Sequence, residues 1–483
     1  MNAGGPPGSD GAGADPILVR LARLAGGPVP VEIRAGIPAR IIDIVGIAVR
    51  ACPLDTSRAA TEFALAQESG AQAPAIGAGR RMAAAEAAVV NGVLAHSLDY
   101  DDTPLPSILH PSASVVPAAL AVAEWRGAPG ADLVDAVAVG LEVAVRLGMG
   151  GYDHRARQSV YFERGQHATS ICGAVGSAAA AARLLGADAD RIADAMGVAC
   201  SMASGIIEAT RAGGTVTRLH CGWAAKAGVT AAQLAVRGFT GPLTAVEGRF
   251  GLFQAFLGAE ADTGAVTAEL GLRWEAERIF YKPYPANHFT HAAIDAAMGL
   301  RRRGVGPDDV ASATLEVAPP TVRTIGDPID AKRRPETGYL AQFSGPYAGA
   351  AGLRGGNGLG VGLADFSDDL ARDPDRRRLM ARIDVTGDPG LMSIYPSQLP
   401  ARLTVTTTGG DTLVEEVLAN RGGPDDPLSD EDLATKYTDN VDGLVSAATA
   451  RSVYEALTGV AAAPSAAALL APLSVVGTGG EDR

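Results

Sequence analysis

The sequence predicts a mainly α protein, in which a large all-α helical domain receives a smaller inserted α+β domain. From about Pro16 to Glu275, apolar residues recur at three- and four-residue steps, the spacing of helices packed against a core. After residue 310, short segments alternate β-branched and polar residues, as strands do. Helical pattern then returns near the C-terminus. We therefore expect both ends of the chain to build the helical domain.

The helical region contains several segments with a clear pattern. Residues 131–148 carry one apolar stripe. The same apolar spacing recurs in segments 174–185, 190–208 and 223–237. Gly238 is a suitable C-cap for the last of them. Several of these segments are rich in Ala on all sides, as expected for helices that are buried on most faces.

Three strand segments mark the insertion: 311–319, 382–389 and 401–417. The last contains Gly409-Gly410 between alternating residues, which predicts a hairpin. Gly- and Pro-rich composition at the N-terminus predicts a disordered tail. The expected division is a tail at 1–15, the helical domain at 16–277 and 423–475, the inserted domain at 278–422, and a loose tail at 476–483.

Composition excludes several classes of protein. With 41 basic and 54 acidic residues the net charge is −13, and no Lys/Arg run exceeds three residues, so we expect no site for nucleic acid. The four cysteines form no C-x-x-C pair, which argues against a disulfide framework or a zinc site. No apolar run approaches the roughly 18 residues of a membrane span. The N-terminus lacks the pattern of a signal peptide, so we expect a cytoplasmic protein without membrane partners.

The stretch "AHSLDYDDTPLPSILHPSAS", residues 95–114, holds two of the seven histidines and three aspartates. Its D-x-D-D-T motif matches the acid motif of class II terpene cyclases, but those need aromatic pockets and aromatics are only 5% here. His96 and Asp99 lie one helical turn apart and could share a divalent metal. A metal-free acid/base and carboxylate-binding loop is the third interpretation. For Asp101 and Asp102, helix capping is an equal alternative.

Three further segments carry candidate groups. His167 precedes a Gly-punctuated helix, whose free N–H groups would favour an anion. Arg218 and His220 follow a Gly pair, and the planar guanidinium suits either a carboxylate or a structural ion pair. Lys282 and His288 lie in "KPYPANHFTHAAID", at the expected domain junction, where ligand sites are common. These histidines could also serve only in packing or at helix starts.

Taken in order, "AHSLDYDDT", "HPSAS", "RGQHATSICGAVG", "TRLHCGWAAKAG" and "KPYPANHFTHAAID" resemble the MmgE/PrpD family, over about residues 17–470. That family includes 2-methylcitrate dehydratases, cis-aconitate decarboxylases and an iminodisuccinate epimerase. The resemblance implies that the inserted domain is a lid and that the protein is a homodimer. It also implies chemistry on small di- or tricarboxylates, without metal or organic cofactor, in a cleft between the domains.

The same resemblance implies a set of site residues. Asp99, His110 and His167 match catalytic positions, and we expect the two histidines to act as an acid/base pair that Asp99 helps to orient. The expected substrate-binding residues are Thr103, Arg218, Lys282, His288 and Tyr347, with Tyr339 as the alternative phenol.

Three positions depart from the family pattern. Thr217 stands where the decarboxylase branch has Lys in "TKxLH", "GQHATS" replaces "GFHPT", and Gln342 replaces the lysine of "AKFS". Two of these changes remove positive charge, so we expect a substrate with fewer carboxylates, or a larger and less charged one.

The leading expected function is a cofactor-independent hydro-lyase, similar to 2-methylcitrate dehydratase, that acts on a small hydroxy-carboxylate. The alternatives are a decarboxylase, an epimerase or isomerase, and a cyclase of a specialised-metabolite pathway on the same fold. A non-catalytic carboxylate-binding protein is the alternative from a different class.

Overall fold

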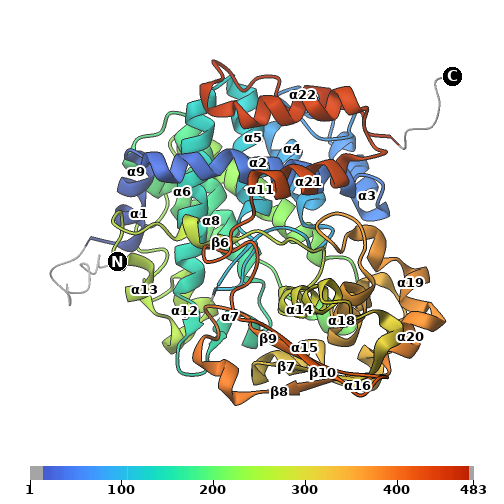
Figure 1. Cartoon of the computed structure of the whole chain (residues 1–483). Coiled ribbons are helices and arrows are strands. Elements are labelled where there is room, and N and C mark those ends of the chain that lie inside the picture. Colours follow the sequence, from blue (N-terminus) through green and yellow to red (C-terminus); the bar gives the residue numbers. More distant parts are fainter. Residues whose placement is uncertain (1–14, 106, 478–483) are drawn as a thin grey trace.

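The structure, a computed structural model, describes residues 15–105 and 107–477 (Figure 1). The predicted tails at 1–15 and 476–483 lie outside the described residues, except for residues 15, 476 and 477. Helices dominate the described part, which confirms the mainly α fold class. None of those helices combines the length and the hydropathy that a membrane span requires.

Helices from both ends of the chain surround one large hydrophobic core (Figure 1, blue to green, and red). They are α1 Ile17–Gly26, α2 Val31–Ala51, α3 Asp55–Ala66, α4 Ala84–His96, α5 Ser112–Arg126, α6 Gly130–Met149, α7 Val160–Glu163, α8 Ala168–Leu184, α9 Ala189–Met202, α10 Glu208–Ala212, α11 Thr217–Ala235, α12 Leu252–Phe256, α13 Thr263–Thr267, α21 Asp430–Val441 and α22 Ala447–Thr458. The C-terminal α21 packs on α2, where Lys436 Nζ lies 2.7 Å from Asp43 Oδ1 with both side chains buried.

The predicted helix at 190–208 ends early, at Met202, because the chain must turn toward α8. Gly205 there has a positive φ of 140°, and its carbonyl accepts from the His167 N–H at 3.0 Å. The helices predicted at 174–185 and 223–237 begin earlier than expected, at Ala168 and Thr217. Gly238 has a positive φ of 104° and follows the end of α11, as a terminating glycine does.

The small residues of these helices allow their backbones to approach closely. A Cβ placed on Gly92 of α4 would lie 2.6 Å from the Cα of Gly222 on α11. At the crossing of α6 and α8, a Cβ on Gly140 would lie 2.9 Å from the carbonyl oxygen of Gly176. This close packing explains the Ala- and Gly-rich pattern, and it fixes the helix ends that carry the site.

Gly222→Ala should lower the free energy of unfolding by about 1–3 kcal/mol, because its methyl group would meet the Val89 carbonyl oxygen at 2.3 Å. Gly36→Ala is the matched control, since nothing lies within 4 Å of a Cβ at that exposed site inside α2. It should raise the free energy of unfolding by about 0.5–1 kcal/mol. Urea unfolding measures both, and equal stability of the two variants would contradict the packing argument.

The second hydrophobic core lies within residues 284–428 (Figure 1, yellow and orange). Its four-stranded sheet has the order β10-β9-β7-β8, in which only β7 and β8 are parallel. The strands are β7 Val310–Val317, β8 Ile383–Gly387, β9 Ala401–Thr407 and β10 Thr412–Val417. The helices are α14 His291–Arg302, α15 Pro319–Ile325, α16 Ile329–Lys332, α17 Gly338–Ala341, α18 Gly345–Arg354, α19 Asp368–Arg372 and α20 Pro374–Met380. The predicted hairpin is confirmed by the pairing of β9 with β10 around Gly410, whose φ is 92°.

A short antiparallel pair joins the two parts of the molecule. Strand β3, Thr103–Pro104, pairs with β6, Ile279–Phe280, with Thr103 opposite Phe280. This pairing brings the loop that holds His110 against the segment that holds Lys282. The exact domain boundaries and the lid role of the second core stay predictions.

Candidate active site

Six of the seven histidines gather in one region, although they come from segments up to 195 positions apart in the chain. The ring centroids of His96 and His110 are 5.2 Å apart, and those of His96 and His167 are 5.6 Å apart. His220 continues the row, 4.8 Å from His167. The exposed His154 lies outside the group, against Tyr152.

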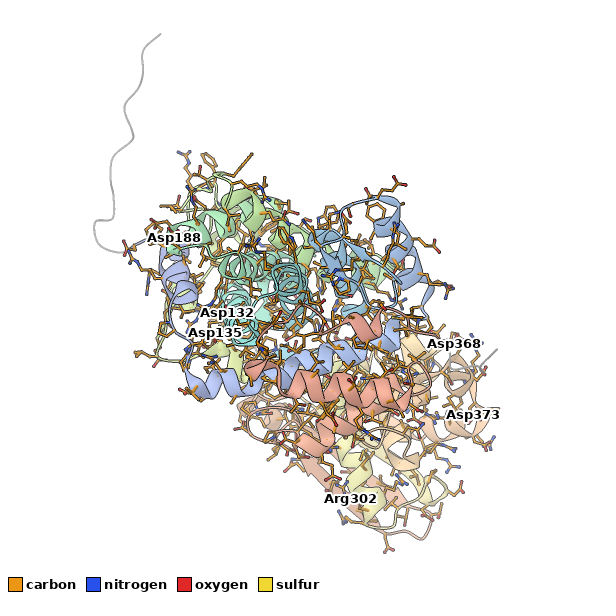
Figure 2. All side chains as sticks on the ribbon, turned by 90° about the horizontal axis from the view of Figure 1, so that it is seen from above. Asp132, Asp135, Asp188, Arg302, Asp368 and Asp373 are labelled. Carbon is orange, nitrogen blue, oxygen red and sulfur yellow. The ribbon has the colours of Figure 1, made fainter. Side chains whose placement is uncertain are left out.

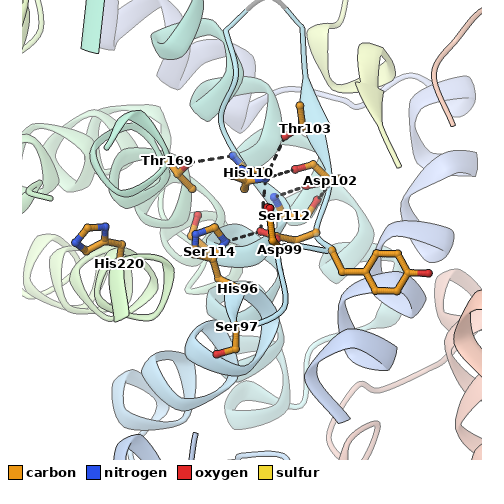
Figure 3. A network of polar contacts seen from close by, with 12 residues as sticks. His96, Ser97, Asp99, Asp102, Thr103, His110, Ser112, Ser114, Thr169 and His220 are labelled. Atoms are coloured by element: carbon orange, nitrogen blue, oxygen red, sulfur yellow. Dashed lines mark hydrogen bonds and ion pairs between the residues drawn. The ribbon is translucent and has the colours of Figure 1, made fainter. Parts of the chain in front are cut away.

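Helix ends place these four rings. His96 is the last residue of α4, His167 is the N-cap of α8, and His220 is in the first turn of α11. His110 lies just before α5, and its backbone N–H donates to Thr169 Oγ1 on α8 at 3.1 Å. Figure 3 shows how the loop of His110 folds over the ends of these helices. Because the helices pack at backbone distance, the rings are held by rigid elements.

His110 is a neutral imidazole with a fixed tautomer. Its Nδ1 donates to the Asp102 carbonyl oxygen at 2.8 Å, and Thr103 Oγ1 lies 3.0 Å from the same nitrogen (Figure 3). A carbonyl oxygen only accepts, so Nδ1 carries the proton and Nε2 keeps its lone pair. Burial lowers the pKa of His110 to about 4, and nearby Lys282 favours the neutral ring further.

His96 and Asp101 form a buried ion pair. His96 Nδ1 lies 2.7 Å from Asp101 Oδ2, and the same oxygen is 3.8 Å from His110 Nδ1. Burial by itself would lower the pKa of His96, but Cys221 and Asp101 outweigh it and hold that pKa well above its usual value. Burial would likewise raise the pKa of Asp101, but His96 and then His110 hold it below its usual value. An imidazolium therefore lies beside the neutral ring of His110.

His167 and His220 form a neutral pair. Their Nδ1 atoms are 2.9 Å apart, so one of them donates a proton and the other accepts it. Burial, followed by the charge of His96, holds the pKa of His167 well below its usual value. Burial and His96 also lower the pKa of His220 to about 4. At neutral pH this pair supplies hydrogen bonds rather than charge.

Asp99 pairs with Lys282 across the two parts of the molecule. Lys282 Nζ donates to Asp99 Oδ1 at 2.6 Å and to its carbonyl oxygen at 2.9 Å. Asp99 adopts a left-handed φ of 51°, which turns this carbonyl and its side chain to the same cation. The expected role of Asp99 in orienting a histidine is thus met by Asp101, which contacts both His96 and His110. Lys282 is 1% exposed, so its positive charge acts in a weakly screened site.

His288 lies on the Lys282 side of the cluster. Burial, followed by Lys282 and His110, lowers its pKa to about 3. Neither ring nitrogen has a hydrogen-bond partner among the described residues. The ring contacts His291 at 4.9 Å between centroids, and His291 Nε2 bonds to the Ala286 carbonyl oxygen at 3.0 Å. A buried imidazole with both nitrogens unused is suited to contact a polar ligand.

Asp102 binds a backbone N–H at the start of α5, as the capping alternative predicted. Its Oδ1 accepts from the Ser112 N–H at the start of α5, and its Oδ2 accepts from Arg40 at 3.1 Å. Burial raises its pKa to about 6, an effect that Arg40 opposes. For Asp101 the capping alternative is wrong, because its contacts are the two histidines.

The remaining predicted residues are divided between the site and the core. Arg218 is half-buried at the start of α11, where its guanidinium donates to Thr56 Oγ1 at 3.1 Å. The Tyr347 hydroxyl contacts Asp365 and Arg376 inside the second core. Of the two candidate phenols, Tyr339 is half exposed and lies close enough to Asp99 and Arg218 for their charges to act on it. Burial raises its pKa, Asp99 adds to that rise, and Arg218 opposes it.

Gln342 stands where the family pattern has a lysine, and here it links two loops. Its side-chain amide donates to the Pro285 carbonyl oxygen at 2.8 Å and reaches that of Leu98 at 3.5 Å. The Gln342 carbonyl accepts from Asn287 N–H at 3.0 Å. This residue therefore fixes the approach of the Lys282 segment to the Asp99 loop without adding charge.

The sequence interpretation missed three groups: His96 and Asp101 as a charged pair, and Cys221 beside them. Spacing alone does not show which aspartate of "DYDD" contacts a histidine. Cys221 lies 125 positions from His96 in the sequence. The metal alternative joined His96 to Asp99, but Asp99 binds Lys282 instead. In the described part of the chain, one group has potential metal-ligand atoms all within 4.8 Å: His96, Asp101 and Cys221.

Comparison with known proteins gives a consistent result. Residues 21–263 match the MmgE/PrpD N-terminal domain and residues 284–458 match the MmgE/PrpD C-terminal domain. The chain is 30% identical over 381 residues to cis-aconitate decarboxylase of Homo sapiens, covering 76% of this chain and 75% of that protein. It is 29% identical over 380 residues to cis-aconitate decarboxylase of Mus musculus, covering 76% and 74%. A match to cis-aconitate decarboxylase of Aspergillus terreus, at 30% over 239 residues, covers 47% and 48%. These matches show that the chain belongs to the MmgE/PrpD family.

Proposed function

We propose that the chain is a cofactor-independent lyase that removes CO₂ from a small unsaturated polycarboxylate. Lyase chemistry is supported by the family and by its decarboxylase relatives. The observation that carries the proposal is the neutral His110 beside the His96–Asp101 ion pair, with ring centroids 5.2 Å apart. A proton acceptor and a proton donor thus share one buried site.

Substrate carboxylates have suitable partners around this pair. Lys282 supplies a buried cation, and Arg218 and the phenol of Tyr339 are the further candidates, since the charges of Asp99 and Arg218 both act on that phenol. The free N–H groups at the start of α8 favour an anion in addition. These groups hold the ends of a dicarboxylate and leave the reacting carbon near His110.

The proposed reaction moves one proton and one electron pair. The substrate binds with the reacting carboxyl group protonated and the others ionised. His110 Nε2 accepts that proton, the bond from the carboxyl carbon to its neighbour breaks, and CO₂ leaves. The electron pair moves through the alkene toward the remaining carboxylate. Nε2–H then returns the proton to carbon, and the imidazolium of His96 stabilises the developing negative charge. His167 was expected to be the second acid/base group. Its pKa is lowered, so its ring is neutral at neutral pH, whereas His96 is protonated and can give a proton.

Dehydration of a hydroxy-carboxylate is the second candidate, and the same ion pair supports it. His110 Nε2 would remove a carbon-bound proton while the His96 imidazolium protonates the departing hydroxyl group. Positioned transfers of this kind contribute about 10²–10⁴-fold each.

Proton and carbon NMR in D₂O separates the two reactions. The purified protein is incubated with cis-aconitate and with 2-methylcitrate in parallel. Release of ¹³C-labelled CO₂ with deuterium bound to the product carbon supports decarboxylation. A new alkene signal without CO₂ supports dehydration. No reaction of either acid, with protein shown to be folded, would contradict the proposal for this substrate class.

Thr217→Lys should lower the KM for cis-aconitate by about tenfold, because it restores a cation beside Arg218 for a third carboxylate. Thr215→Lys is the matched control, since it adds the same charge two residues earlier at an exposed position. Steady-state kinetics at fixed ionic strength measures both. An equal effect of the two variants would show that only long-range charge matters.

We also propose that the protein is a homodimer, that residues 278–422 act as a lid and that the protein is cytoplasmic. Sedimentation of the purified protein tests the first of them.

A further inference from the structure

The second part of the molecule carries an open hollow of about 790 Å³, and its lining contains no histidine. It lies between α16, α19 and α20. Figure 2 labels Asp368 and Asp373, at the two ends of α19 in this lobe. The hollow is lined by five arginines and one acid: Arg333, Arg334, Arg372, Arg377, Arg378 and Asp330. Such a gathering is unexpected in a chain of net charge −13.

Backbone carbonyls hold three of these guanidinium groups in place. Arg372 Nε donates to the Glu336 carbonyl oxygen at 2.9 Å, and Arg377 Nη2 donates to that of Pro335 at 3.1 Å. Arg333 Nε donates to the Ile383 carbonyl oxygen at 3.1 Å. Each guanidinium has five N–H donors, so an anchored one keeps donors for a ligand. The hollow is therefore preorganised for an anion.

The acids around the hollow do not neutralise it firmly. Asp384, Glu336, Asp375 and Asp368 form ion pairs with Arg333, Arg377, Arg378 and Arg372, respectively. The side chains of these four acids are 58–70% exposed. Exposed ion pairs are worth only about 0–1 kcal/mol, so a multivalent anion can replace them. The Arg334 guanidinium is exposed and has no hydrogen bond or ion pair to any described residue.

We propose that this hollow binds a small anion with two or more linked phosphate groups, at a site separate from the proposed active site. Five guanidiniums around one space match a ligand with several closely spaced negative charges. A volume of about 790 Å³ exceeds the needs of a single phosphate and suits a di- or triphosphate, with or without a nucleoside. None of the lining residues belongs to the histidine cluster.

Calorimetric titration of the full chain at fixed ionic strength tests the proposal. The probes are inorganic triphosphate, adenosine triphosphate and sulfate, which offers a single anionic group. Triphosphate should bind in one-to-one ratio, and the double variant Arg334→Gln/Arg378→Gln should weaken binding by at least about tenfold. Binding of adenosine triphosphate more tightly than triphosphate identifies a nucleotide, and equal or weaker binding identifies free polyphosphate. Sulfate should bind far more weakly than either.

A matched control removes the same charge elsewhere. Arg237→Gln/Arg451→Gln changes two exposed arginines outside the hollow and should leave triphosphate affinity unchanged. Equal losses in both double variants would overturn the proposal, because binding would then reflect net charge only. Absence of triphosphate binding, or sulfate affinity equal to that of triphosphate, would also overturn it. Turnover of the carboxylate substrate is measured separately, so failure here leaves the proposed lyase function standing.

Discussion

His110→Ala should lower turnover by roughly 100-fold or more while the protein stays folded. The loss is expected because Nε2 of His110 is the lone pair that takes up the proton in either proposed reaction. Nδ1 is occupied by the Asp102 carbonyl oxygen, so no second nitrogen can substitute. Because the ring is neutral in the wild type, its removal leaves no unpaired buried charge. Steady-state kinetics and circular dichroism measure the two effects.

His154→Ala is the control for this variant, since His154 is exposed and lies outside the cluster. It should keep near-normal turnover. The pH profile adds a second readout: with a pKa of about 4, His110 should remain an active base throughout the neutral range. Near-normal turnover of His110→Ala with cis-aconitate, once the wild type is shown to react, would exclude His110 as the base.

Asp101→Asn should lower the free energy of unfolding by about 3–5 kcal/mol at pH 6, because it leaves the buried imidazolium of His96 without its counter-ion. Asp101 is fully buried and pairs with His96 at 2.7 Å. Typical domains are stable by only about 5–15 kcal/mol, so the loss is a large part of the total. Urea unfolding followed by circular dichroism measures it.

The pH dependence has a defined sign. The folded-state pKa of Asp101 is lowered, so its contribution is present above the unfolded pKa of about 3.9 and is lost as pH falls further. The folded-state pKa of His96 is raised, so its contribution is complete below about pH 6.5 and is lost as pH rises through the folded value. The difference between wild type and Asp101→Asn should therefore be greatest at about pH 5–6.5 and shrink below pH 4.

Asp153→Asn provides the comparison, because this acid bonds only to local backbone N–H groups. It should change stability by much less. If Asp101→Asn unfolded at the same urea concentration as the wild type at pH 6, the ion pair would not exist in solution.

The regular elements were accessible from sequence because each depends on local periodicity. The hairpin around Gly410 and the apolar stripe of α6 were recognised with little ambiguity. The end of α9 and the start of α11 were not, because they depend on contacts with distant segments. Gly205 turns away from the helix to meet His167, which no local pattern indicates.

The site was partly predictable for the same reason. The family motifs singled out His110, His167 and Lys282, and the structure brings these residues into one region. The sequence did not show which acid pairs with which cation. Helical spacing would place Asp99 beside His96, but with its left-handed φ Asp99 binds Lys282, and Asp101 pairs with His96 instead. Cys221 reaches His96 only through the close crossing of α4 and α11, a tertiary feature that depends on Gly92 and Gly222.

The C-terminal helix α21 has a consequence for the order in which the enzyme is built. Lys436 pairs with Asp43, and its Nζ also donates to the Tyr100 carbonyl oxygen at 3.2 Å, directly between Asp99 and Asp101. A ribosome-bound chain that has emerged only to residue 420 already contains every histidine. It still lacks Lys436, whose contact with the Tyr100 carbonyl oxygen holds the loop of Asp99 and Asp101. Activity should therefore appear late in synthesis, when the last helices dock, and not when the final histidine leaves the ribosome.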